Sequence, residues 1–418
     1  NRIIQNSSKA KVLGEFSFVN YIVTSKILKT MKNRKLLMIP GPIEFEPAVL
    51  QALGAPTSSH VAPDFINSFG NCIELMRKIW QSPTGQPFII AGSGTLAMDM
   101  AAANLIESND NVLVLSTGYF GERYAEITKR YGANVTILTT EPGTTIPLEK
   151  IETELAKKSY KIITITHVDT STGVLFDPKP IAEIAKKYNT LSILDGVCSV
   201  AGEEIKQEEW GIDIVLTASQ KAIGVPPGLA LLMVSKKAME SFKNRKSPVG
   251  NYYADFTNWL PIMNAYENRQ ASYFGTPPVN LIAALEVSLQ QIVAEGMETR
   301  FIRHIKIATA FREAMLALGL LLLPTNKNHS ANTLTATYYP KGIDATTFLQ
   351  KIGNNNVIVA GGLLPSLKTQ YFRVGHMGSV NNNDILATIG AIESCLIACK
   401  YNYEKGIGIK TALNILNT

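Results

Sequence analysis

The stretch "GIDIVLTASQKAIGVPPG", residues 211–228, places a lysine where a buried strand gives way to a constrained loop. After Asp213 the run up to Ala218 is apolar and uncharged apart from one threonine, which predicts an interior strand. Lys221 follows at the carboxyl end of this strand, where open α/β sheets place their ligand crevice. An ordinary solvated lysine is the alternative. A partly buried lysine at this edge has a lowered pKa, so the stretch predicts that Lys221 is a usable amine nucleophile.

The composition predicts a globular protein that buries a substantial core. The chain has 418 residues, 46% of them hydrophobic and 18% charged, and a net charge of +6. That charge is mild for this length and does not argue for nucleic acid as a partner. No apolar run reaches the length of a membrane span, so no membrane partner is expected. The cysteines form no CxxC pair and no cluster with metal-ligand spacing, which predicts no metal site and fits an intracellular compartment.

Strand and helix patterns alternate from about residue 86, beginning with "PFIIAGSGT" and "LAMDMAAANLI". This alternation predicts an α/β fold in which helices cover both faces of a mostly parallel sheet. We expect a large domain over residues 31–290, beginning with an extended arm, and a smaller α+β C-terminal domain over 291–418. A long helical pattern begins near Pro278, and a final helix is expected from Asn383 toward Lys400.

The first residues, 1–30, form a basic leader or tail. Residues 1–35 hold eight Lys or Arg against a single acid, Glu15, with frequent Ser and Thr. This pattern is typical of an organellar transit peptide and would favour mitochondria. A disordered basic tail, or a true start at Met31, is the alternative reading. The last residues do not form a peroxisomal signal of the Ser-Lys-Leu type.

Other chemistry-bearing residues stand at the ends of predicted strands. "AGSGT" places Ser93, Gly94 and Thr95 between a strand and a helix, where converging backbone amides favour an anion such as a phosphate. Asp195 ends the strand "TLSILD", and a carboxylate buried there needs a cation. A tight strand-to-helix turn and a capping aspartate are the plainer alternatives. Together with Lys221 the set suits pyridoxal phosphate: the lysine would bond to the aldehyde, and the aspartate would hold the ring nitrogen protonated.

The sequence resembles the class V, fold-type I aminotransferases, specifically the alanine–glyoxylate and serine–pyruvate aminotransferases. The resemblance covers roughly residues 36–400 and rests on motifs that occur in the family's order: "PGP", "AGSGT", "STGYFGER", "THVDTSTGVL", "LDGVCSVAGEE", "GIDIVLTASQKAIGVPPG", "YFGTPPV" and "FRVGHMG". It implies the fold-type I pyridoxal phosphate transferase fold and that cofactor.

Matching positions imply roles for individual residues. The resemblance makes Lys221 the Schiff-base lysine and proton shuttle, Asp195 the partner of the pyridinium, and Arg373 the guanidinium that grips the substrate carboxylate. Tyr273 and Thr276 match positions that reach the phosphate of the neighbouring subunit, which implies a homodimer. The remaining cofactor-binding positions are Ser93, Gly94, Thr95, Phe120, Thr170, Val197 and Gln220.

The implied reaction moves the amino group of L-alanine, or of L-serine, to glyoxylate and yields glycine, with pyruvate when alanine is the donor. A serine–pyruvate enzyme, another aminotransferase of small amino acids and a non-catalytic protein that kept the fold are the alternatives. A cysteine desulfurase is disfavoured because no cysteine lies between Cys198 and Cys395. No basic site for a phosphoserine substrate is recognisable, and "GSGTLAM" lacks the third glycine of a nicotinamide-binding loop. The family habit favours peroxisomes.

Plainer readings stay open for several of these side chains. Phe120 and Tyr273 could be core aromatics, and Arg373 could belong to a structural ion pair. His167 is expected to be structural, and His376 either shapes the substrate pocket or is structural. Asp169, in "VDTSTG", is assigned no direct role.

Overall fold

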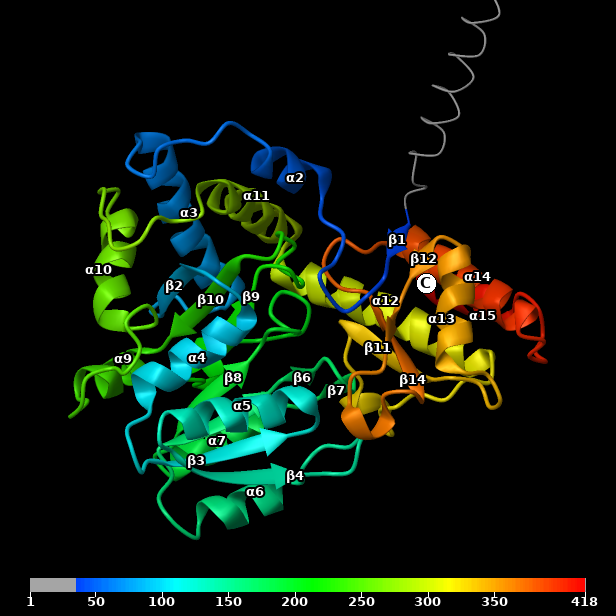
Figure 1. Ribbon diagram of the computed structural model, residues 1–418, viewed down its shortest axis with the longest axis horizontal. Coiled ribbons are helices and arrows are strands. Elements are labelled where there is room, and N and C mark those ends of the chain that lie inside the picture. The colour runs from blue at the N-terminus through cyan, green and yellow to red at the C-terminus, as the bar shows by residue number, and fades with distance from the viewer. Residues whose placement is uncertain (1–34, 418) are drawn as a thin grey trace, which may run out of the picture. The chain divides into compact units, whose positions relative to one another are not determined.

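The computed structural model describes residues 35–417. The predicted leader, residues 1–30, lies outside the described residues. A seven-stranded sheet in the order β2-β10-β9-β8-β5-β3-β4 organises the chain up to α11 (Figure 1). Its strands are β2 (Gln86–Ala91), β10 (Leu229–Val234), β9 (Ile214–Ala218), β8 (Leu191–Asp195), β5 (Ile162–Thr166), β3 (Asn111–Ser116) and β4 (Asn134–Thr139).

The sheet is parallel except for β10, which pairs antiparallel with both β2 and β9. The other ladders join β3 with β4 and β5, and β8 with β5 and β9, all in parallel. Every residue of β5, β8, β9 and β10 is buried, as expected for strands with helices on both faces. The prediction of a mostly parallel α/β sheet is confirmed. Because β2, β9, β8, β5 and β3 run the same way, their carboxyl ends lie along one edge.

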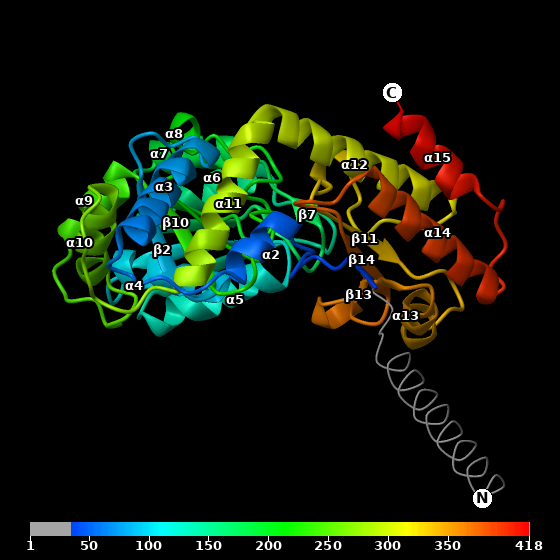
Figure 2. The ribbon, with the colours of Figure 1, turned by 90° about the horizontal axis from the view of Figure 1, so that it is seen from above.

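Helices cover the two faces of this sheet. Figure 2 shows α4 (Gly94–Leu105) and α5 (Tyr119–Arg130) on one side, and α6 (Leu148–Leu155), α7 (Pro178–Lys187) and α8 (Gln207–Trp210) on the other. Right-handed crossovers require this split, because the chain moves along the sheet in opposite directions before and after β4. The remaining helices up to this point are α2 (Pro47–Leu53), α3 (Pro63–Ile79), α9 (Lys236–Lys243), α10 (Phe256–Glu267) and α11 (Val279–Glu295).

A second, antiparallel sheet lies in the last third of the chain. It has the order β11-β14-β13, from β11 (Leu334–Tyr338), β14 (Tyr371–Gly375) and β13 (Ala360–Gly361). It is accompanied by α12 (Met297–Ala317), α13 (Ala345–Asn354), α14 (Asn382–Ala398) and α15 (Ile407–Leu416). Short elements complete the fold: β1 (Leu36–Leu37), β6 (Val168–Asp169), β7 (Val174–Leu175), β12 (Val357–Ile358) and two 3₁₀ turns, η1 (Lys327–His329) and η2 (Pro365–Leu367).

The structure differs from the expected helices in two places. The long helical pattern from Pro278 is two helices, because Gly296 breaks it with a φ of 82°, which only glycine adopts easily. The helix that ends at Ala398 is not the last one, since α15 follows it and packs against α12 and α14. The boundary at 290/291 stays a prediction. Within residues 35–417 no helix is both long enough and apolar enough to cross a membrane.

Candidate active site

One cavity of about 240 Å³ opens where the parallel strands end. It gathers nine of the residues expected to bind the cofactor: Ser93, Gly94, Thr95, Phe120, Thr170, Asp195, Val197, Gln220 and Lys221. These residues come from the carboxyl end of β8, from the loops after β2, β6, β8 and β9, and from the first turns of α4 and α5. The sequence order alone scatters them over 129 positions, from 93 to 221, and the parallel sheet brings them to one edge.

Lys221 is held by the loop that follows β9. The Gly224 amide donates to the Lys221 carbonyl at 2.8 Å, and the Ser219 hydroxyl donates to the Pro226 carbonyl at 2.8 Å, so the loop folds back on itself. The side chain is 8% exposed, and its ammonium donates to the Pro40 carbonyl. Burial lowers the pKa of Lys221, and the nearby Arg373 lowers it further, against opposing effects of Cys198 and Asp195. The amine is therefore easier to deprotonate than a surface lysine.

Asp195 ends β8 with its carboxylate in the same cavity. The residue is 3% exposed, and its Oδ1 accepts the Val197 amide at 3.0 Å. Burial raises the pKa of Asp195 to about 7, while the Val197 amide and the charges of Lys221 and Arg123 lower it. A cation placed in the cavity would hold this carboxylate ionised.

The α4 N-terminus forms another wall. Ser93 is the cap residue, and its Oγ accepts the Leu96 amide at 3.5 Å. The amides of Gly94 and Thr95 begin the helix and have no acceptor within it. A Cβ on Gly94 would lie 2.8 Å from Val197 Cγ2, so glycine allows the close approach of α4 to the loop after β8. Nearby, Gln220 Oε1 is buried without a hydrogen-bond partner among residues 35–417.

Phe120 is placed by a buried carboxylate from another strand. The Phe120 amide donates to Asp169 Oδ2 at 3.0 Å, and the Gly121 amide donates to the same oxygen at 3.4 Å. These are N-terminal amides of α5, which otherwise lack acceptors. Asp169 therefore fixes the start of the helix that carries Phe120, a positioning role that was not foreseen.

Arg373 lies on β14 and reaches the loop that carries Thr170. Its Nε donates to the Gly361 carbonyl at 2.9 Å, and a terminal nitrogen donates to the Thr170 carbonyl at 2.9 Å. Among residues 35–417 no carboxylate lies within ion-pair distance of Arg373, which disfavours the alternative of a structural ion pair. Arg373 does not line the 240 Å³ cavity, although its positive charge lowers the pKa of Lys221.

Tyr273 and Thr276 are not brought to this cavity by their own chain. They lie between α10 and α11, and the Tyr273 side chain is 63% exposed. Its ring is tilted against the His60 ring, with the centroids 5.5 Å apart. Tyr273 is therefore not a core aromatic, and its predicted role in a neighbouring subunit stays a prediction.

Sequence reasoning missed several residues of the cavity. Arg123 lines it from α5, three positions after Phe120, a helical spacing that could have signalled it. Cys198 lines it with a thiol whose pKa is raised by burial. Gly41, of the "PGP" motif, has a φ of +120°, and a Cβ there would lie 2.6 Å from Lys221 Cδ. The glycine thus lets the arm pass against the lysine side chain.

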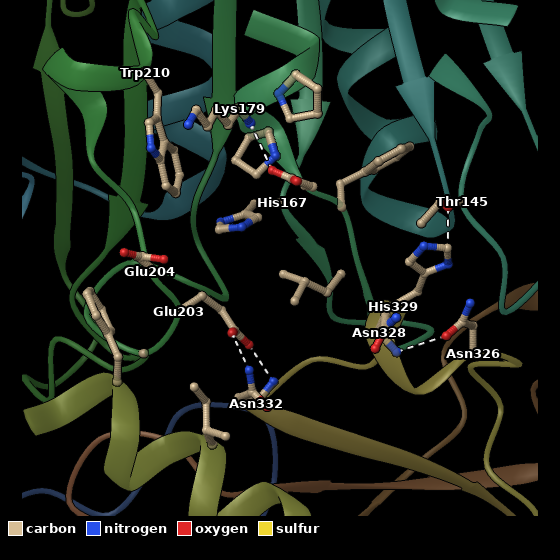
Figure 3. Close-up of a pocket in the computed structure, with 18 of the residues that line it drawn as sticks. Thr145, His167, Lys179, Glu203, Glu204, Trp210, Asn326, Asn328, His329 and Asn332 are labelled. Atoms are coloured by element: carbon tan, nitrogen blue, oxygen red, sulfur yellow. Dashed lines mark hydrogen bonds between the residues drawn. The ribbon is translucent and has the colours of Figure 1, made fainter. Parts of the chain in front are cut away.

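The two candidate histidines lie away from this cavity. His167 lines a larger hollow of about 1000 Å³, which shares no residue with the first (Figure 3). Its Nδ1 lies 2.9 Å from Ser199 Oγ, and burial lowers the pKa of His167 to about 3. His376 is fully buried, with Nε2 2.8 Å from Thr335 Oγ1 and Nδ1 3.1 Å from the Asn332 carbonyl oxygen. Burial lowers the pKa of His376 to about 3 as well, so both imidazoles are neutral at pH 7.

The residues of the 240 Å³ cavity fit pyridoxal phosphate. A buried amine, a buried carboxylate and a helix N-terminus border one space, and the described part of the chain leaves the Gln220 oxygen there without a partner. A buried polar atom without a partner indicates a missing ligand or water. Lys221 would hold the aldehyde, Asp195 the ring nitrogen, and the α4 start the phosphate. Within the described part of the chain no group of His, Cys, Asp or Glu could hold a metal ion.

This fold and cavity define a fold-type I, pyridoxal phosphate-dependent aminotransferase. The model of the family "Aminotransferase class-V" matches residues 50–375, and the chain belongs to that family. It is 40% identical to alanine–glyoxylate aminotransferase 1 of Saccharomyces cerevisiae, over 83% of this chain and 93% of that protein.

Two further proteins illustrate the range of these similarities. The serine–glyoxylate aminotransferase of Hyphomicrobium methylovorum is 31% identical over 90% of this chain and 93% of its own. The crystal structure of an alanine–glyoxylate aminotransferase from Nostoc sp. matches with a TM-score of 0.83 and 31% identity, over 87% of this chain and 96% of the other.

Proposed function

We propose that this protein is an alanine–glyoxylate aminotransferase, which transfers the amino group of L-alanine to glyoxylate and yields pyruvate and glycine. The observation that carries the proposal is the 40% identity to the yeast alanine–glyoxylate enzyme over most of both chains. The site supports it because Lys221 and Asp195 share one buried cavity. A non-catalytic binding protein has no need of both groups in that arrangement.

Pyridoxal phosphate supplies an electron sink for the carbanion formed at the amino acid's α-carbon. The chain's own residues then have distinct tasks. Lys221, with its pKa lowered by burial, can be neutral; it would hold the cofactor through its aldehyde, with loss of water, and once freed would accept the proton from the donor's α-carbon. The Asp195 carboxylate would hold a proton on the ring nitrogen of a bound cofactor. Arg373 offers forked N–H donors to the substrate carboxylate, which a lysine cannot reproduce.

The proposal includes a homodimer in which Tyr273 and Thr276 reach the partner's phosphate site. Supporting it, the loops on either side of α10 expose large aromatic residues, with Tyr252 79% exposed before the helix and Tyr273 63% exposed after it. Burial of such rings stabilises an interface. The subcellular site, peroxisomal by family habit or mitochondrial if residues 1–30 are a transit peptide, remains a further part of the proposal.

L-Serine is the second candidate donor, because a relative with 31% identity is named a serine–glyoxylate aminotransferase. A half-reaction separates the donors. The purified protein, supplied with pyridoxal phosphate, is given L-alanine without a keto acid, and its visible absorbance is followed; glyoxylate is added afterwards. We expect the band of the lysine-bound cofactor to fall with alanine and to return with glyoxylate.

If the band does not change with alanine but falls with serine, L-serine is the amino donor instead of L-alanine. A protein with no such band would contradict the proposal and favour the non-catalytic alternative. Lys221→Ala is the matched control, since it removes the covalent bond without adding side-chain bulk to the cavity.

A further inference from the structure

Arg123 is a cation in the cofactor cavity without a counterion from the described part of the chain. It lines the cavity from α5 and is half-buried. Among residues 35–417 no Asp or Glu forms an ion pair with it. A guanidinium is always charged, and one that borders a ligand cavity without a carboxylate partner points to an anionic ligand group.

The guanidinium is held in place by rings of its own helix. Its Cζ lies 4.9 Å from the centroid of the Phe120 ring and 5.0 Å from that of the Tyr119 ring. A terminal nitrogen lies 3.4 Å from the Tyr119 hydroxyl. These partners stand three and four positions before Arg123, where side chains of one helix meet. Cation–π contacts of this kind restrict the guanidinium to one region of the cavity.

From that position Arg123 reaches the start of α4. Its other terminal nitrogen donates to Thr95 Oγ1 at 3.3 Å. A hydroxyl has one proton and accepts through its lone pairs, so a Thr95 oxygen that accepts from Arg123 keeps its proton free for an anion. Thr95 is the second residue of α4, where the free backbone amides also favour an anion. The Arg123 guanidinium and the start of α4 therefore lie together at one end of the cavity, and both favour a negatively charged group there.

We propose that Arg123 belongs to the phosphate subsite of the cofactor, where its guanidinium supplies positive charge and directs the Thr95 hydroxyl toward the phosphate oxygens. This inference rests on the proposed cofactor site and adds a residue to it. The charge of Arg123 also acts on Asp195 inside the cavity: it lowers the pKa of that carboxyl, against the larger effect of burial.

The test compares two ligands that differ only in the phosphate. Cofactor-free wild type, Arg123→Gln and Arg123→Lys are titrated with pyridoxal phosphate and with pyridoxal, and binding is followed by quenching of tryptophan fluorescence. We expect Arg123→Gln to raise the dissociation constant of pyridoxal phosphate about tenfold to a hundredfold and to leave that of pyridoxal within about twofold. Arg123→Lys keeps the charge and should fall between. Arg130→Gln, at the exposed end of the same helix, is the matched control.

Equal weakening of both ligands would overturn the inference, because it would mean that Arg123 acts only through the Phe120 ring. Unchanged binding of both ligands would overturn it as well. Inorganic phosphate gives a second readout: it should compete with pyridoxal phosphate for wild type and compete less well for Arg123→Gln. Wild type that fails to bind pyridoxal phosphate would instead contradict the proposed function, so the two failures are distinguishable.

Discussion

Replacement of Asp195 by asparagine should abolish the pH dependence of stability that this carboxyl gives to the cofactor-free protein. Burial raises the pKa of Asp195 to about 7, from an ordinary value of 3.8. Between these values the folded protein keeps a proton that the unfolded chain releases. Asp195 therefore makes the free energy of unfolding fall as the pH rises from about 4 to about 7. The Asp195→Asn variant has an amide at this position, which does not titrate.

The expected size of the stability difference follows from the pKa shift of Asp195. A rise of about 3 pKa units corresponds to on the order of 4 kcal/mol, at 1.36 kcal/mol per unit. At a pH of about 4 the free energies of unfolding of wild type and Asp195→Asn should differ least, because the folded side chains are neutral and the unfolded aspartate is only about half ionised. At a pH of about 8 the cofactor-free variant should be the more stable, by up to this amount. Bound cofactor should remove the advantage, because a ring cation compensates the carboxylate.

The assay is urea unfolding of cofactor-free protein at fixed concentration in phosphate-free buffers, followed by tryptophan fluorescence across this pH range. Glu122→Gln, which removes a charge from the exposed side of α5, is the control for net charge. Glu203 has its pKa raised to about 7 by burial as well, so only the difference between the two proteins isolates Asp195. A stability difference that is the same at both ends of the range would refute the reasoning.

Three further substitutions test the geometry around the cavity. Gly41→Ala should displace Lys221, because its Cβ would lie 2.6 Å from that side chain, and borohydride trapping should then recover little lysine-bound cofactor. Arg373→Lys should raise the KM for L-alanine about tenfold to a hundredfold through loss of the forked contact, with the dissociation constant of pyridoxal phosphate unchanged; a change in the latter alone would contradict a substrate role. Tyr371→Phe should lower the free energy of unfolding, measured in urea, by about 2–4 kcal/mol. The buried hydroxyl accepts hydrogen bonds from two backbone amides and donates one to the Ser171 carbonyl, and the variant loses all of them. An unchanged urea midpoint would show that these hydrogen bonds add no net stability.

Local patterns in the sequence were enough to predict the sheet and the residues at its strand ends. Apolar runs of strand length that alternate with helical patterns predict a parallel sheet, and this architecture brings the ends of its strands to one edge. That is why Lys221, Asp195 and the Ser93–Thr95 turn could be expected together, although they come from three different strands. The family resemblance added the implied roles.

Tertiary structure alone decided which side chains meet through space. Arg123 looks like one more surface arginine in "GERYAEI", until the sheet brings α5 beside α4 and its guanidinium reaches Thr95. The close approach of Gly41 to Lys221 joins positions that are 180 residues apart in the sequence. The hydrogen bond from Arg373 to the Thr170 carbonyl joins positions that are 203 residues apart. Sequence periodicity reports which face of an element is buried, and it is silent on what packs against that face. The sheet and its strand ends were therefore determined by sequence, whereas the close approaches and positioning contacts of the site were decided by the fold.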